Sequence, residues 1–242
     1  MPADETAIAS DGVPLALRRF EGPDARAAVL VTHAMMATGQ YLEKFAGHLA
    51  ASGLDVFVLE FRGHGRSGGS ARGFEDYVRK DLPAALDHVR TRSPAARRRL
   101  GYVGHSLGGL AGLAYAATHA AQVAAHGPHA LVLVAVSLWR RNLAPLPQRW
   151  LRDATMAGFA LTAALLGRVP ARRLRLGAAD EPRGYALQLA RWHFTSTWRS
   201  PDGLDYARAL ANVRVPSLSV WSAGDPLARG RDVRAITDRL GV

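Results

Sequence analysis

The residues that could do chemistry are concentrated in the segment Gly104–Gly108, which has the sequence Gly-His-Ser-Leu-Gly. A short apolar run ends at Val103 just before it, and a run of small residues suited to a helix follows from Leu110 to Ala117. A serine in a sharp turn between a strand and a helix exposes its hydroxyl above the sheet, and flanking glycines let strand and helix approach closely. We therefore predict that Ser106 is a nucleophile.

Length and composition limit the classes of protein to which this chain could belong. The 242 residues can form one domain with a sizeable core, and the lack of cysteine excludes disulfides and cysteine-based metal sites. The acidic start, Met1–Glu5, has no apolar stretch typical of a secretory signal. The longest apolar run, from Ala154 to Gly167, is shorter than the roughly 20 residues needed to cross a bilayer. We expect a cytoplasmic protein without a transmembrane segment.

The formal net charge of +11 raises the question of a nucleic-acid partner. All but two of the 31 basic residues are arginine, and they are scattered along the chain. No zinc finger, aromatic RNA-binding motif or basic heptad accompanies them, so we predict no nucleic-acid partner. Anionic substrates and a membrane surface stay among the possible partners, because a positive charge attracts both over long range.

Apolar strands alternate with helical segments along the first half of the chain. This alternation predicts an α/β fold with a mostly parallel, doubly wound sheet. Besides the run before Ser106, the expected strands are Pro14–Phe20 at an edge, Ala27–Thr32, Asp55–Phe61, His129–Ser137 and Val215–Trp221. The expected helices are Tyr41–Ser52, a turn at Phe74–Val78, a helix from Asp81, the helix after Ser106 and Gly230–Leu240.

The pattern changes between residues 138 and 211, where helical periods, five prolines and four of the five tryptophans occur without a strand-like run. An insertion that leaves a strand end is expected to lie over the carboxyl edge of the sheet, where catalytic loops collect. We predict a core of residues 1–137 and 212–242 and a helical cap of residues 138–211. Within the cap, Ala154–Leu166 either packs against its neighbours or, in part, lines an acyl pocket.

Three motifs together resemble the serine aminopeptidase and monoacylglycerol-lipase-like group of the α/β-hydrolase superfamily. They are His33-Ala34-Met35, the segment around Ser106, and Gly224-Asp225-Pro226, and the loop Arg62–Ser67 is also similar to that superfamily. The cap resembles a bacterial branch of predicted hydrolases. The resemblance implies an α/β-hydrolase fold, a serine-based mechanism, and no metal or organic cofactor.

The resemblance implies a role for three further residues. Asp225 follows the last apolar strand and corresponds to the catalytic acid, although an aspartate before proline is also common in turns. The backbone amides of Leu107 and Met35 correspond to the oxyanion hole, which needs two donors placed in advance. Ala34 stands where the family usually has glycine.

The catalytic base is missing from this pattern. The superfamily order places a histidine after the acid, but all nine histidines precede Asp225. We expect that the chain is C-terminally incomplete at Val242, lacking the last strand, the loop with the catalytic histidine and the terminal helix. The alternatives are a natural pseudoenzyme or a substitute base, for which His193 in the cap is the first candidate.

These observations predict a serine hydrolase that cleaves small-molecule carboxylic esters, with the 242 residues alone inactive. Aminopeptidase or acyltransferase chemistry on the same residues is the alternative among enzymes. A non-catalytic binding protein is the alternative outside them. The sequence does not predict the oligomeric state.

Overall fold

The structure is a computed structural model that describes residues 2–241. Its centre is a seven-stranded sheet with the strand order β1-β2-β4-β3-β5-β6-β9. The pairs β1–β2 and β2–β4 are antiparallel, and the other neighbours are parallel. The strands are β1 (Ala3–Ile8), β2 (Pro14–Phe20), β3 (Ala27–Thr32), β4 (Leu54–Leu59), β5 (Leu100–His105), β6 (Ala130–Val134) and β9 (Ser217–Val220).

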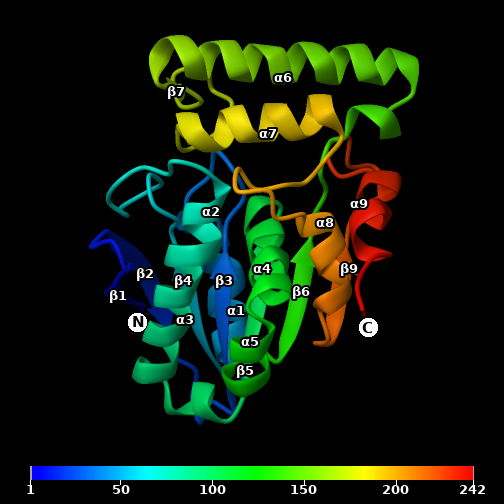
Figure 1. The fold of residues 1–242 in the computed structure, drawn as a ribbon. Helices are drawn as coiled ribbons and strands as arrows, with labels where there is room; N and C mark the ends of the chain where they lie inside the picture. Colours follow the sequence, from blue (N-terminus) through cyan, green and yellow to red (C-terminus); the bar gives the residue numbers. More distant parts are fainter. Residues whose placement is uncertain (1, 242) are drawn as a thin grey trace.

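Helices cover both faces of the sheet and its carboxyl edge. Figure 1 shows α3, α4 and α8 in front of the sheet, α1 behind it, and α6 and α7 above it. The helices are α1 (Glu43–Ala51), α2 (Phe74–Asp76), α3 (Leu82–Arg92), α4 (Leu107–Thr118), α5 (Ala120–His126), α6 (Leu146–Leu166), α7 (Arg183–Thr195), α8 (Tyr206–Ala209) and α9 (Gly230–Thr237). A π-helical turn, Tyr77–Asp81, joins α2 to α3.

The two faces of the sheet build two separate apolar cores because neighbouring side chains of a strand point to opposite faces. On β3, Leu30 packs into the larger core under α3 and α4, while Val31 packs into the smaller core under α1. Both side chains are almost fully buried. This explains why β3 is continuously apolar, as expected of a parallel strand covered on both sides.

The strand β9 forms one edge of the sheet, and among the described residues β6 is its neighbour. Leu218 and Val220 lie in register with Val132 and Val134, on the face that carries α1. They are 58% and 46% exposed, since α1 covers the other half of that face. The end of the sheet at β9 therefore presents an open edge with apolar side chains. Val242, on which one of our expectations rests, lies outside the described residues.

The cap consists mainly of α6 and α7, which lie side by side above the sheet (Figure 1). A small ladder of β7 (Arg168–Val169) and β8 (Glu181–Pro182) closes the loop between them. The buried side chain of Arg152 on α6 forms two hydrogen bonds with buried Asp232 on α9. This ion pair ties the cap to the last helix of the core.

The structure corrects three details of the expected fold. Pro14–Phe20 is not an edge strand, because β1 pairs with it on the outside. We missed β1 because most of its side chains are exposed, which leaves it without an apolar run. The cap does contain strands, but each has two residues and is too short to leave a pattern in the sequence. No helix in residues 2–241 is long and apolar enough to cross a membrane.

Candidate active site

The backbone at Ser106 has an unusual conformation, with φ 49° and ψ −108°. Ser106 lies between β5 and α4, and its backbone N–H donates to the carbonyl of Val134 at 2.9 Å. Its half-buried side chain forms no capping hydrogen bond with the helix. Backbone in this region costs a non-glycine residue about 1–3 kcal/mol and persists where the surroundings impose it. The turn therefore holds the hydroxyl away from the helix that follows it.

Two close contacts explain the glycines of this turn. A Cβ atom at Gly104 would lie 2.5 Å from the Cα of Gly109, where strand and helix cross. A Cβ atom at Gly108 would overlap the hydroxyl of Thr32 on β3. The hydroxyl of Tyr102 also donates to the carbonyl of Gly108 at 2.6 Å. The start of α4 is thus packed tightly against β3 and β5.

The loop after β3 contains the second predicted oxyanion donor, Met35. The amide of Ala34 donates to the hydroxyl of Tyr41 at 3.0 Å, and the amide of Met36 donates to Oε2 of Glu181 at 2.7 Å. The Met35 amide lies between these two and has no backbone acceptor within residues 2–241. As the first residue of α4, Leu107 also has an amide that no intrahelical acceptor can reach.

Alanine at position 34 fits this loop because the left-handed conformation occurs two residues later, at Met36, with φ 53°. Gly177 supports the loop from the cap: a Cβ atom there would overlap the carbonyl of Met36. The backbone N–H of Ala179 donates to the same carbonyl at 3.1 Å. The conformation of the loop therefore depends on contacts with the cap and does not need a glycine at position 34.

His33 is fully buried and holds the base of this loop. Its Nε2 accepts from the N–H of Phe61 at 3.1 Å, and its Nδ1 lies 2.7 Å from the carbonyl of Ala34. Burial, together with the nearby His64, lowers the pKa of His33 to about 3. A neutral imidazole with both nitrogens engaged is a structural element and has no nitrogen left for Ser106.

Glu60, directly after β4, connects two loops at this edge of the sheet. Its Oε1 accepts from the N–H of Gly39 at 3.0 Å, and its Oε2 accepts from the N–H of Arg66 at 2.8 Å. The chain at Gly65 passes so close, with φ +52°, that a Cβ atom would overlap the carboxylate of Glu60. Arg62, at the start of the second loop, is buried and paired with Asp81 at 2.7 Å.

Glu181 brings a buried carboxylate from the cap to the same place. Besides the Met36 amide, its Oε2 contacts Nε2 of His64 at 3.4 Å. Burial would lower the pKa of His64, but the carboxylate of Glu181 raises it above the usual value of 6.5. The charge on His64 is therefore coupled to a side chain that positions the loop with Met35.

The predicted acid Asp225 lies in the loop after β9. Its Oδ1 accepts from the backbone N–H groups of Leu227, at 2.8 Å, and Ala228, at 3.1 Å. Both bonds go to one oxygen, which leaves Oδ2 available to another donor. Because β5 and β9 run parallel within one sheet, Ser106 and Asp225 follow strand ends at the same edge.

Within residues 2–241, no hydrogen bond joins a histidine to Ser106. In the cap, His193 is buried, with Nε2 2.8 Å from Oδ1 of Asp153 and Nδ1 3.1 Å from the carbonyl of Trp139. His105 contacts the hydroxyl of Tyr41 at 2.7 Å through Nδ1. His193 is thus engaged inside the cap, which counts against it as a substitute base. No group of three or more side chains that could hold a metal ion is found among residues 2–241.

Residues 23–180 match the profile of a family described as serine aminopeptidase, S33. The chain belongs to this family. The resemblance inferred from the motifs is thereby confirmed, and this S33 family member is a hydrolase of the α/β type. No curated protein matches it.

Solved structures of hydrolases share the fold of this S33 family member. A hydrolase from Pseudomonas aeruginosa is 24% identical with a TM-score of 0.64, and the match covers 98% of this chain and 86% of the other. An esterase from Exiguobacterium antarcticum is 15% identical with a TM-score of 0.65, covering 98% and 88%. An esterase from Pyrococcus furiosus is 16% identical with a TM-score of 0.62, covering 99% and 77%. At these identities the comparison confirms the α/β-hydrolase fold, a mostly parallel central sheet with flanking helices.

Sequence reasoning missed three side chains that hold the site of this hydrolase together: Tyr41, Glu60 and Glu181. Glu60 could have been suspected, because a carboxylate follows a buried strand directly. Glu181 left no comparable signal, since it is far from the loop in sequence and meets it only when the cap folds over the sheet.

Proposed function

We propose that this protein is a serine hydrolase that cleaves carboxylic esters through an acyl-enzyme, with Ser106 as the nucleophile. The observation that carries the proposal is the strained backbone of Ser106 between β5 and α4, which keeps its hydroxyl free of the helix. Strain of this kind at a strand-to-helix junction is typical of nucleophile turns.

On this proposal, ester cleavage proceeds through a tetrahedral intermediate and an acyl-enzyme. The oxygen of Ser106 attacks the ester carbonyl carbon while its proton passes to a base. The amides of Leu107 and Met35 donate to the oxyanion that forms, each contributing about 3 kcal/mol to lowering the barrier. Collapse of this intermediate expels the alcohol, which takes the proton, and water then releases the acid from Ser106. Asp225 orients the base through Oδ2.

We propose that the base is a histidine other than those engaged at this site in the structure. His33, His64, His105 and His193 all have other partners in the structure, and the superfamily order places the base after the acid. On this account, the 242 residues by themselves turn over esters slowly or not at all.

The same observation favours a second candidate, a non-catalytic binding protein that keeps the turn without the base. Aminopeptidase and acyltransferase activities use the same groups and differ in the acyl acceptor or the bond cleaved. Ester and amide substrates therefore have to be compared directly.

The test measures turnover of p-nitrophenyl esters and aminoacyl p-nitroanilides by the protein expressed from its whole gene. We expect ester cleavage that Ser106→Ala lowers by about 10³-fold or more. Faster cleavage of the anilides would instead indicate an aminopeptidase. A protein that folds and is inactive on both substrates would support the binding protein.

A further inference from the structure

The outer face of α6 is apolar along its whole length. Trp150 and Leu165 are 71% and 73% exposed, and Figure 1 shows that no other element lies above this helix. At about 100° per residue, the exposed positions fall on one side of the helix. They are Leu146, Pro147, Trp150, Leu151, Ala154, Ala157, Gly158, Leu161, Ala164, Leu165 and, at its margin, Leu166.

The polarity of this helix is the reverse of that expected for a surface helix. Its charged residues, Arg149, Arg152 and Asp153, are all at least partly shielded from solvent, and Arg152 and Asp153 pair with side chains of the protein. Our hypothesis that Ala154–Leu166 lines an acyl pocket does not hold for Leu161 and Leu165, which point away from the protein. Packing within the cap does not account for these side chains, because α7 lies on the opposite side.

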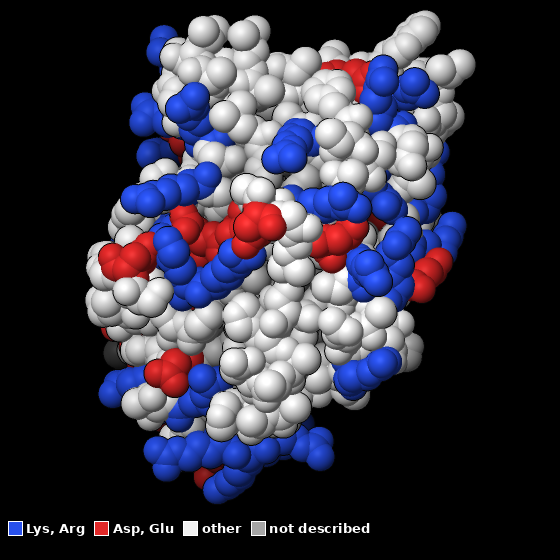
Figure 2. Space-filling model, viewed as in Figure 1, with Lys and Arg blue, Asp and Glu red and all other residues white. Residues whose placement is uncertain are grey.

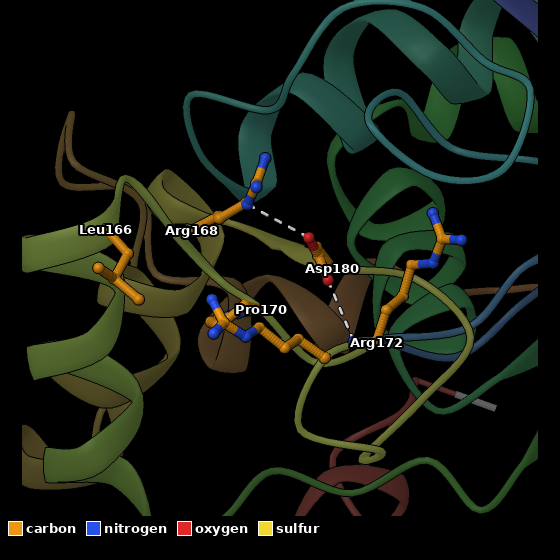
Figure 3. A pocket seen from close by; sticks show the side chains of 6 residues that line it. Leu166, Arg168, Pro170, Arg172 and Asp180 are labelled. Carbon is orange, nitrogen blue, oxygen red and sulfur yellow. Dashed lines mark hydrogen bonds and ion pairs between the residues drawn. The ribbon is translucent and has the colours of Figure 1, made fainter.

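Arginines border this face at the carboxyl end of α6. In Figure 3, Leu166 lies beside a hollow of about 610 Å³ that is also lined by Arg168, Arg172 and Asp180. Asp180 pairs with Arg168 at 3.2 Å, whereas Arg172, Arg173 and Arg175 form no ion pair among the described residues. Residues 172–176, Arg-Arg-Leu-Arg-Leu, are all exposed. In Figure 2 the surface over α6 is largely white, with blue patches on the flank where β7 lies and a mixed red and blue patch at the other end of the helix.

We propose that this face of the cap, comprising the outer side of α6 and residues 172–176, docks on a membrane surface rich in anionic phospholipid. Helices that lie in a membrane surface carry tryptophan and leucine on one face and basic residues beside them, as here. The net charge favours a membrane over a second copy of this chain as the partner. An anionic surface attracts the unpaired arginines, whereas a second copy, with its own net charge of +11, would repel them. The helix lies flat and does not cross the membrane.

The test is flotation of the 242-residue protein with vesicles of phosphatidylcholine, with and without phosphatidylglycerol. We expect binding that requires phosphatidylglycerol. Leu161→Ser with Leu165→Ser, and separately Arg172→Glu with Arg173→Glu, should each weaken binding by about tenfold. The tryptophan emission should shift to shorter wavelength on binding, and Trp150→Phe should abolish most of that shift.

Two controls separate docking from general effects of charge and apolarity. Arg97→Glu with Arg98→Glu makes the same charge change before the start of β5, at the edge of the sheet opposite the cap. Leu218→Ser removes another exposed leucine, from β9. Both should bind as the unchanged protein does, and thermal unfolding should show that all variants fold. Absence of vesicle binding, or equal loss in these controls, would overturn the proposal. The proposal would also be overturned if the protein bound no vesicles but formed a dimer, and the substitutions on α6 dissociated that dimer.

Discussion

The carboxylate of Glu181, in the cap, accepts a hydrogen bond of 2.7 Å from the backbone N–H of Met36, in the loop after β3. The same oxygen lies 3.4 Å from Nε2 of His64. Oε1 of Glu181 is buried without a hydrogen-bond partner among the described residues. The cap thus contributes a charged group to the loop that carries the proposed oxyanion donor Met35, so loop geometry and cap position are coupled.

Glu181→Gln should destabilise the protein more at low pH than at high pH. Because the pKa of His64 is raised in the folded protein, the ion pair stabilises fully below 6.5 and is lost as pH rises through the folded pKa. We expect a loss of about 2 kcal/mol in the free energy of unfolding at pH 5.5 and a smaller loss at pH 9. Urea unfolding at both pH values measures this difference.

Asp180→Asn is the matched control, since it changes the neighbouring carboxylate, which pairs with exposed Arg168. Its effect should stay below about 1 kcal/mol. A pH-independent effect of Glu181→Gln would show that Glu181 acts only as a hydrogen-bond acceptor for Met36.

Ser106→Gly should stabilise the protein by about 1 kcal/mol. Glycine adopts φ 49° and ψ −108° without the clash of a Cβ atom, and this gain exceeds the entropy that glycine adds to the unfolded chain. Ser106→Ala keeps the Cβ atom and should leave the free energy of unfolding within about 0.5 kcal/mol. Equal stability of the two variants, measured by thermal unfolding, would mean that the turn stores no strain.

Gly104→Ala should cost about 3 kcal/mol or prevent folding, because the added Cβ atom would meet backbone atoms of Gly109. Gly101, on the same strand, provides the control. A Cβ atom there finds its nearest neighbour, a methyl group of Val29, at 3.6 Å, an ordinary contact. Gly101→Ala should therefore be neutral within about 0.5 kcal/mol. If the two variants lose the same stability, the close approach of β5 and α4 is not what requires glycine.

Several of these features were visible in the sequence because they depend on neighbours along the chain. The apolar run, Gly104–Gly108 and the helix after it predict the turn at Ser106, and the continuous apolar run of β3 predicts a strand covered on both sides. Contacts between distant segments left no such pattern. The pairing of β1 with β2 and the contact of Glu181 with Met36 arise only in the folded chain, and so does the outward direction of the leucines on α6.

Asp232→Asn should destabilise the protein by about 3–5 kcal/mol, because it leaves the buried guanidinium of Arg152 without its partner charge. Replacing both residues, as Arg152→Met with Asp232→Leu, should cost less than Asp232→Asn alone, since no charge then remains buried. Asp87, exposed and paired with Arg90, is the control, and Asp87→Asn should cost less than about 1 kcal/mol. Urea unfolding measures these losses. If the loss of the double variant equals the sum of the losses of the two single substitutions, the ion pair does not couple the cap to the core.

The most direct test of the central claim is to identify the residue that a fluorophosphonate probe modifies. The probe is applied to the protein expressed from its whole gene, with Ser106→Ala as the control, and the labelled peptide is sequenced by mass spectrometry. We predict a single adduct on the oxygen of Ser106, absent from the control. An adduct on another residue, or none on a protein shown to be folded, would contradict the assignment of Ser106 as the nucleophile.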